Sequence, residues 1–123
     1  MTLLGERTLT ADRAARLVRP GDRVFIGTAC ATPRTLVRAL EELPDPPAGV
    51  TLVHSLTDRI GLSPDDGPAT TAYRHRVFYV GSDVRDLLDT GLIEYVPVSL
   101  ADVPAMFTDG HLPLPDHLAE GLA

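Results

Sequence analysis

The 123-residue sequence has one cysteine, no tryptophan and few aromatic residues of any kind. A single thiol, Cys30, excludes both an internal disulfide and a four-thiol zinc site, and it fits a reducing compartment. Aromatic residues make up 5% of the chain, so stacking surfaces for bases or sugars are scarce. A core must therefore be built from leucine, valine, alanine and isoleucine.

Long hydrophobic runs and basic clusters are also missing. No stretch approaches the roughly 18 apolar residues of a membrane span, and Glu6 and Asp12 interrupt the N-terminal segment. The 17 acidic and 11 basic residues give a net charge of -6, without a basic cluster that could follow a phosphate backbone. None of the four histidines shows metal-ligand spacing with another histidine or with the cysteine. We expect a cytoplasmic protein without a membrane span, a nucleic-acid partner or a metal site.

The chain nevertheless has enough apolar material for one globular domain, with 44% hydrophobic and 23% charged residues. Short apolar runs predict strands at residues 23–26, 50–53, 77–80 and 93–98. Helices are expected after four residues whose hydroxyls can cap them: Thr10, Thr32, Ser82 and Ser99. Residues 55–71 lack apolar periodicity and predict a long loop.

This alternation of strands and helices predicts the fold class. We expect an α/β domain over residues 1–111, with an open, mostly parallel sheet and helices on both faces. The tail, residues 112–123, holds two prolines and little pattern, so we expect it to be irregular. In such sheets ligands bind beyond the carboxyl ends of the strands.

The segment from Gly27 to Pro33 is the most informative stretch, because it follows the first predicted strand and consists of small residues. A ligand can approach such a backbone closely, and the next helix offers N-terminal N–H groups to an anionic or carbonyl group. The segment is neither a dinucleotide fingerprint nor a phosphate loop, since Gly27 stands alone and no lysine follows. A tight turn between strand and helix explains the same pattern, and both interpretations remain open.

Two further positions could carry chemistry. A helix N-terminus lowers a thiol pKa, but Cys30 has no arginine six positions later, as a phosphatase loop requires, and we interpret it as a buried, inert thiol. His54, Ser55 and Thr57 follow the second predicted strand at the ligand edge of the sheet. A hydroxyl there could bind substrate or only cap the loop. No acidic pair identifies a catalytic residue.

Three segments also carry a family resemblance. Residues 21–27, GDRVFIG, run into a small-residue loop, as in a G-D-x-V strand motif. Residues 73–81, YRHRVFYVG, are similar to an R-H-x-x-F-F-x-G segment. Farther along, Arg85, Gly91, residues 95–98, Ser99 and residues 103–104 fall in order as in an R…G…Y-x-P-x…S-x-x-P run. Together these motifs resemble the acetyl-CoA hydrolase/transferase family, which includes 4-hydroxybutyrate CoA-transferases.

The resemblance implies a CoA-transferase fold and a reaction. An acyl-CoA and a small carboxylate, such as acetate or 4-hydroxybutyrate, would exchange CoA through a glutamyl thioester on the enzyme. Coenzyme A is then a substrate, and no permanently bound cofactor is implied. The resemblance places substrate and CoA binding at six residues: Gly27, Thr28, Ala29, Thr32, Pro33 and Thr57.

The resemblance covers only an N-terminal portion of the family pattern. The family's nucleophilic glutamate belongs to a C-terminal half that is not matched, so no catalytic residue is assigned and we expect the isolated chain to be inactive. Two functions remain open: the N-terminal part of an acyl-CoA transferase or hydrolase, and a non-catalytic CoA-binding or assembly module. A C-terminal catalytic half or a homo-oligomer would complete the assembly.

Overall fold

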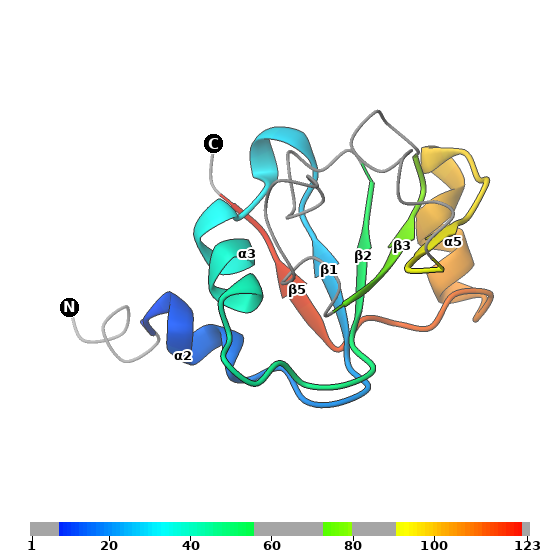
Figure 1. Cartoon of the computed structure of the whole chain (residues 1–123). Coiled ribbons are helices and arrows are strands. Elements are labelled where there is room, and N and C mark those ends of the chain that lie inside the picture. Colours follow the sequence, from blue (N-terminus) through cyan, green and yellow to red (C-terminus); the bar gives the residue numbers. More distant parts are fainter. Residues whose placement is uncertain (1–7, 56–72, 80–90, 122–123) are drawn as a thin grey trace.

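The structure, a computed structural model, describes residues 8–55, 73–79 and 91–121, and its strands form one parallel sheet (Figure 1). The sheet has five strands in the order β4-β3-β2-β1-β5, and every neighbouring pair is parallel. The strands are β1 (Arg23–Ile26), β2 (Thr51–His54), β3 (Arg74–Val77), β4 (Ile93–Tyr95) and β5 (His117–Ala119). The loop predicted beyond Ser55, with Thr57, and the helix predicted after Ser82 lie outside the described residues.

Three strand predictions hold with small shifts, and one is wrong by three residues. β1 has the predicted bounds, β2 begins one residue later than predicted, and β4 ends before Pro97. β3 begins at Arg74, whereas the apolar run predicted a strand at residues 77–80. The alternation of burial along β3 explains the miss, because His75 and Val77 are buried while Arg74 is exposed.

The tail contains the fifth strand, so the prediction of an irregular segment over residues 112–123 is wrong there. β5 pairs with β1, and the Gly27 N–H donates to the Ala119 carbonyl at 2.8 Å. At the other end of the pair, the Arg23 N–H donates to the Asp116 carboxylate at 2.8 Å. The chain thus returns to the first strand after two prolines, and the sheet extends to Ala119.

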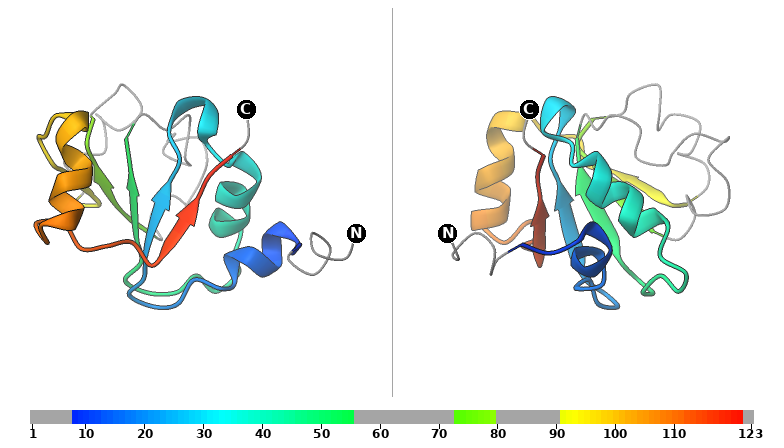
Figure 2. Two further views of the ribbon diagram at one scale, coloured as in Figure 1. Left: turned by 180° about the vertical axis from the view of Figure 1, so that it is seen from behind. Right: turned by 90° about the vertical axis from the view of Figure 1, so that its left-hand side faces the viewer.

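Helices cover both faces of the sheet, which confirms the predicted fold class (Figure 2). On one face, α2 (Ala11–Ala15) and α3 (Arg34–Glu41) cover a buried cluster that includes Ala15, Ile26, Val37, Leu40 and Leu52. On the other face, η5 (Leu100–Asp102) leads into α5 (Val103–Thr108), and a second cluster contains Val53, Phe78, Val103 and Leu112. Within the described ranges, no helix has the length and apolar content needed to cross a membrane.

Only one of the described helix caps forms as predicted. The Thr10 hydroxyl accepts the Arg13 N–H at 3.3 Å at the start of α2. Before α3, however, the chain forms the short helix η1 (Ala29–Ala31), and α3 begins at Arg34. The Thr32 hydroxyl instead donates to the Gly27 carbonyl at 3.2 Å, and Ser99 makes no side-chain cap bond. Thr32 therefore closes the loop after β1 and does not cap a helix.

Candidate functional site

A cavity of about 280 Å³ lies at the carboxyl ends of β1, β2 and β3, where open α/β sheets bind ligands. The sheet, the loop after β1 and the start of α5 each supply part of its lining. The lining residues are Phe25, Thr28, Ala29, Ser55, Phe78, Leu100, Val103 and Pro104. Most of these side chains are apolar, and Thr28 and Ser55 contribute the hydroxyls.

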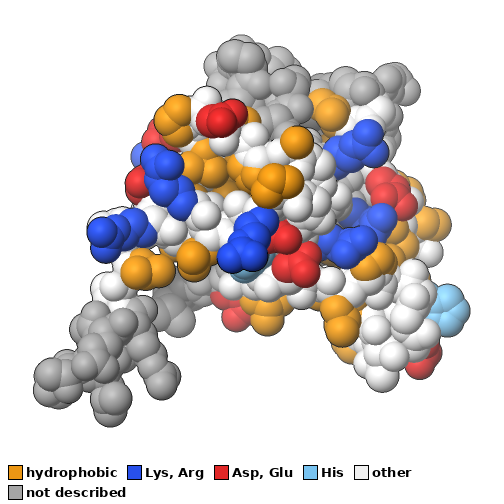
Figure 3. Space-filling model, turned by 90° about the horizontal axis from the view of Figure 1, so that it is seen from below, with side chains coloured by type: hydrophobic (Ala, Val, Ile, Leu, Met, Phe, Trp, Pro, Cys, Tyr) orange, Lys and Arg blue, Asp and Glu red, His pale blue; other side chains and the backbone are white. Residues whose placement is uncertain are grey.

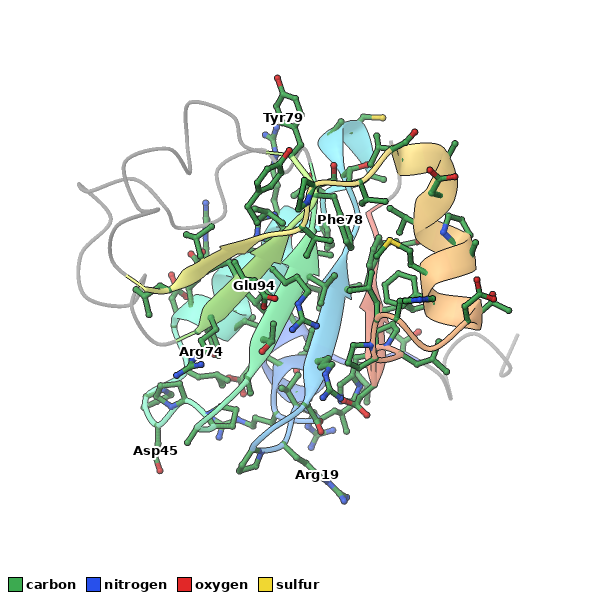
Figure 4. The ribbon with its side chains drawn as sticks, turned by 90° about the vertical axis from the view of Figure 1, so that its right-hand side faces the viewer. Arg19, Asp45, Arg74, Phe78, Tyr79 and Glu94 are labelled. Carbon is green, nitrogen blue, oxygen red and sulfur yellow. The ribbon has the colours of Figure 1, made fainter. Side chains whose placement is uncertain are left out.

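The strands position the aromatic wall of this cavity. Phe25 pairs in register with Val53, whose side chain belongs to the cluster beneath α5. The Phe78 N–H donates to the His54 carbonyl at 3.2 Å, so the ladder continues one residue beyond β3. The Phe78 ring meets Phe107 of α5 edge to face, with ring centroids 6.5 Å apart. Figure 4 shows Phe78 directed toward α5 and the next residue, Tyr79, directed away from the sheet.

The loop after β1 supplies Thr28 and Ala29, two of the six residues predicted to bind substrate. Ala29 has a φ of 47°, a left-handed conformation that costs residues with a side chain about 1–3 kcal/mol. Two backbone hydrogen bonds hold it there: the Ala31 N–H donates to Thr28 O at 2.8 Å, and the Thr32 N–H to Ala29 O at 3.1 Å. The surrounding turn thus fixes the backbone at the cavity wall.

Three other predicted binding residues, Gly27, Thr32 and Pro33, are not among the described lining residues. Gly27 is buried, and a Cβ at this position would collide with the backbone carbonyl of Ala31. The turn itself therefore requires a residue without a side chain at this position. Thr32 and Pro33 are buried outside the cavity lining, and Thr57 lies outside the described residues. Substrate binding at these positions stays a prediction.

Cys30 is exposed, so the prediction of a buried thiol is wrong. It occupies the middle of the short helix η1, between Ala29, which lines the cavity, and Ala31. Cys30 itself is not among the lining residues. The thiol is therefore accessible to reagents in solvent, and it does not form part of the described cavity lining.

A buried histidine pair joins β2 to β3. His54 and His75 are 1% and 3% exposed, and His54 Nε2 lies 3.0 Å from His75 Nδ1. Burial lowers the pKa of His54 from 6.5 to about 4, and burial with the neighbouring His54 lowers the pKa of His75 to about 3. Both rings are therefore neutral at pH 7, and one donates its N–H to the other. The His54 side chain thus links β2 to β3 inside the sheet and is not among the described residues that line the cavity.

A second cavity of about 250 Å³ lies at the opposite end of the sheet, and its lining is mixed in charge. It is lined by Arg16, Val18, Leu43, Pro44, Asp45 and Pro47. Figure 3 looks onto this end and shows arginine, acidic and hydrophobic side chains interspersed. Among the described residues, no three His, Cys, Asp or Glu side chains converge as metal ligands. The cavity at the carboxyl ends, with its mostly apolar lining and two hydroxyl groups, is the better candidate for an organic ligand.

Comparison with known proteins places this arrangement in a family. The model of the acetyl-CoA hydrolase/transferase N-terminal domain matches residues 5–118. The chain belongs to this family. The resemblance inferred from the three sequence segments is thereby confirmed, and this acetyl-CoA hydrolase/transferase domain includes all five described strands up to Leu118 of β5.

Individual relatives are several times longer than this domain. It is 29% identical over 109 residues to a 4-hydroxybutyrate coenzyme A transferase of Clostridium kluyveri, a match that covers 89% of this chain and 25% of the relative. It also resembles the crystal structure of RipA from Yersinia pestis, with a TM-score of 0.69, 17% identity, and 84% and 26% of the two chains covered. The structure of a RipA point mutant gives a TM-score of 0.70 at 17% identity, with 83% and 26% covered. These structures support the fold, and the chain spans about a quarter of each relative.

Proposed function

We propose that this domain forms the acyl-binding part of a CoA-transferase or acyl-CoA hydrolase. The observation that carries the proposal is the cavity of about 280 Å³ at the carboxyl ends of β1 to β3. It is lined by Thr28 and Ala29, which belong to the small-residue loop of the family motif. The family match and the relative named 4-hydroxybutyrate coenzyme A transferase support this choice of reaction.

In this proposal, the acyl group of an acyl-CoA occupies the apolar cavity, and the acceptor is a small carboxylate such as acetate or 4-hydroxybutyrate. Phe25 and Phe78 would contact the acyl carbons. The Thr28 hydroxyl is one polar group on the lining that could donate to the thioester carbonyl. Coenzyme A is a substrate here, and the reaction would take place in the cytoplasm.

The attacking carboxylate must come from outside this lining. None of the described lining residues carries a carboxylate, thiol or imidazole, and transfer through an acyl-enzyme needs such a nucleophile within reach of the carbonyl. The same observation favours a second candidate function, a module that binds CoA esters without catalysing their exchange. A C-terminal catalytic half or another copy of the chain would complete the enzyme in the first case.

Titration calorimetry with butyryl-CoA tests the proposed site. A Thr28→Trp variant would fill the cavity, and we expect it to weaken binding at least about tenfold relative to the unaltered chain. Thr35→Trp is the matched control, because Thr35 is an exposed residue of α3 outside the lining. Equal affinities in all three proteins would contradict the assignment of the site.

A second assay separates binding from catalysis. The purified chain is incubated with acetyl-CoA and isotope-labelled acetate, and the appearance of label in acetyl-CoA reports CoA exchange. Mass spectrometry then searches for a hydroxylamine-sensitive CoA adduct. We expect binding without exchange and without an adduct. Turnover above a heat-denatured control, or an adduct on an Asp or Glu of this chain, would show that the nucleophile is already present.

A further inference from the structure

The size and lining of the cavity indicate which acyl groups fit it. This inference rests on the proposed function. An acetyl group is only a methyl and a carbonyl, each comparable in size with a water molecule, which occupies roughly 30 Å³ in the liquid. A cavity of about 280 Å³ is several times larger than such a group needs. Acetyl would therefore leave most of the apolar wall without contacts.

Beyond the loop, Ser55 is the one polar residue among the described lining residues, and the rest of the wall is apolar. Phe25, Phe78, Leu100, Val103 and Pro104 are five of the eight lining residues. An alkyl chain that displaces water from such a wall gains affinity with each methylene buried, by about fourfold per group. The favourable ligand is thus one whose carbons continue past the thioester and along the two phenylalanines.

The same wall has no partner for a charge at the far end of that chain. None of the described lining residues is an arginine or a histidine. Arg76 precedes Phe78 by two residues on β3, but its Nε and Nη2 both donate to Glu94 Oε2, each at 3.0 Å. A terminal carboxylate in the cavity would lose its water without gaining a cation, which is costly.

We infer that this domain selects thioesters of uncharged acyl chains of about four to six carbons, with Leu100 as a specificity-determining residue. Leu100 lines the cavity from η5, yet it is 58% exposed. Its side chain therefore forms the border between the cavity and solvent. A cation at this position would stand beside the far end of a bound chain without entering the core.

Leu100→Lys tests this role, and Leu114→Lys is its matched control. Leu114 is 68% exposed and is not among the lining residues, so both variants replace an exposed leucine by the same cation. Dissociation constants are measured by calorimetry for CoA, acetyl-CoA, valeryl-CoA and glutaryl-CoA. Valeryl and glutaryl groups have equal carbon counts and differ in whether a methyl or a carboxylate ends the chain.

We expect the unaltered chain to bind valeryl-CoA about tenfold or more tightly than acetyl-CoA and than glutaryl-CoA. Leu100→Lys should reduce the preference for valeryl over glutaryl at least about fivefold, while Leu114→Lys leaves it within about twofold. Equal binding of acetyl, valeryl and glutaryl esters, each tighter than CoA, would overturn the inferred selectivity and leave the proposed function standing. Equal binding of CoA and all its esters would overturn both. An unchanged preference in Leu100→Lys would remove Leu100 from the inference.

Discussion

Acid should destabilise this domain through the buried pair of His54 and His75. Both rings are neutral in the folded state, because burial lowers the pKa of His54 to about 4 and that of His75 to about 3. In the unfolded chain each histidine titrates near 6.5. Between these values the unfolded chain binds more protons than the folded chain, so stability falls as the pH falls.

The size of the effect follows from the two pKa differences. At pH 5 each histidine lies about 1.5 pH units below its unfolded pKa, and each unit corresponds to about 1.4 kcal/mol. The free energy of unfolding should therefore be about 4 kcal/mol lower at pH 5 than at pH 7.5 for the pair. This is a large part of the roughly 5–15 kcal/mol that stabilises an ordinary domain.

The contribution of this pair to the pH dependence of stability can be distinguished from that of other titrating groups. The pKa of Asp22 is lowered from 3.8, mainly by its hydrogen bond with the Arg19 N–H and then by His117, whose Nε2 lies 2.8 Å away. Its contribution to stability is present above pH 3.8 and is lost only below that value, outside the window from pH 7.5 to 5. His111 is exposed and supplies a control position.

Urea unfolding followed by far-ultraviolet circular dichroism at pH 7.5, 6.5, 5.5 and 5 measures the effect. Replacing both buried rings, as in His54→Leu with His75→Leu, should flatten the dependence of unfolding free energy on pH, whereas His111→Gln should leave it as in the unaltered chain. A free energy of unfolding that stays constant from pH 7.5 to 5 in the unaltered chain would refute the reasoning.

Three further outcomes follow from local contacts. Gly27→Val should cost at least about 2 kcal/mol of stability, because its Cβ would collide with the Ala31 carbonyl; urea unfolding measures the loss, and unchanged stability would show that the turn can shift. Cys30→Ser should change stability by less than about 0.5 kcal/mol, and the native thiol should react with Ellman's reagent within minutes; a thiol that reacts only in denaturant would contradict its exposed position. A double-mutant cycle on Arg76 and Glu94 should give a coupling below about 1 kcal/mol, since the Glu94 side chain is 62% exposed; a coupling of several kcal/mol would mean that this surface is covered.

The parts of the fold that could be predicted are those whose sequence pattern is local. The apolar residues of β1 and the turn glycine that follows them predict a strand and its end, and the structure confirms both. Thr10 precedes a run of helix formers and caps α2 as expected. The alternation of such elements was enough to predict a parallel sheet with helices on both faces.

The elements that were missed depend on contacts between distant residues. β3 begins with the polar run Arg74, His75 and Arg76, which does not have the pattern of a buried strand. It is stabilised as a strand by a contact with the neighbouring strand, the hydrogen bond between His75 and His54. β5 is a three-residue strand whose only described partner is β1, nearly a hundred residues earlier in the chain. No local pattern indicates either pairing, since each is stabilised by its neighbour in the sheet.

The candidate site was predicted in part for the same reason. Its loop, with Thr28 and Ala29, has a recognisable run of small residues beside a predicted strand end. The apolar wall comes from one residue of β1, one residue just after β3, and residues of η5 and the start of α5, so its members are scattered along the sequence. Phe25 and Phe78 lie inside the strands predicted at residues 23–26 and 77–80, and a phenylalanine in each of these two strands is the signal that could have identified them.

Binding of an acyl-CoA at the carboxyl ends of the strands is tested most directly by nuclear magnetic resonance. The ¹⁵N-labelled chain is titrated with valeryl-CoA, and the shift of each backbone amide is followed. We expect the largest changes at Thr28, Ala29 and Val103, which line the carboxyl-end cavity, and none at Val18 and Leu43, which line the opposite one. Changes concentrated at Val18 and Leu43, or no changes at saturating ligand, would contradict the proposed site.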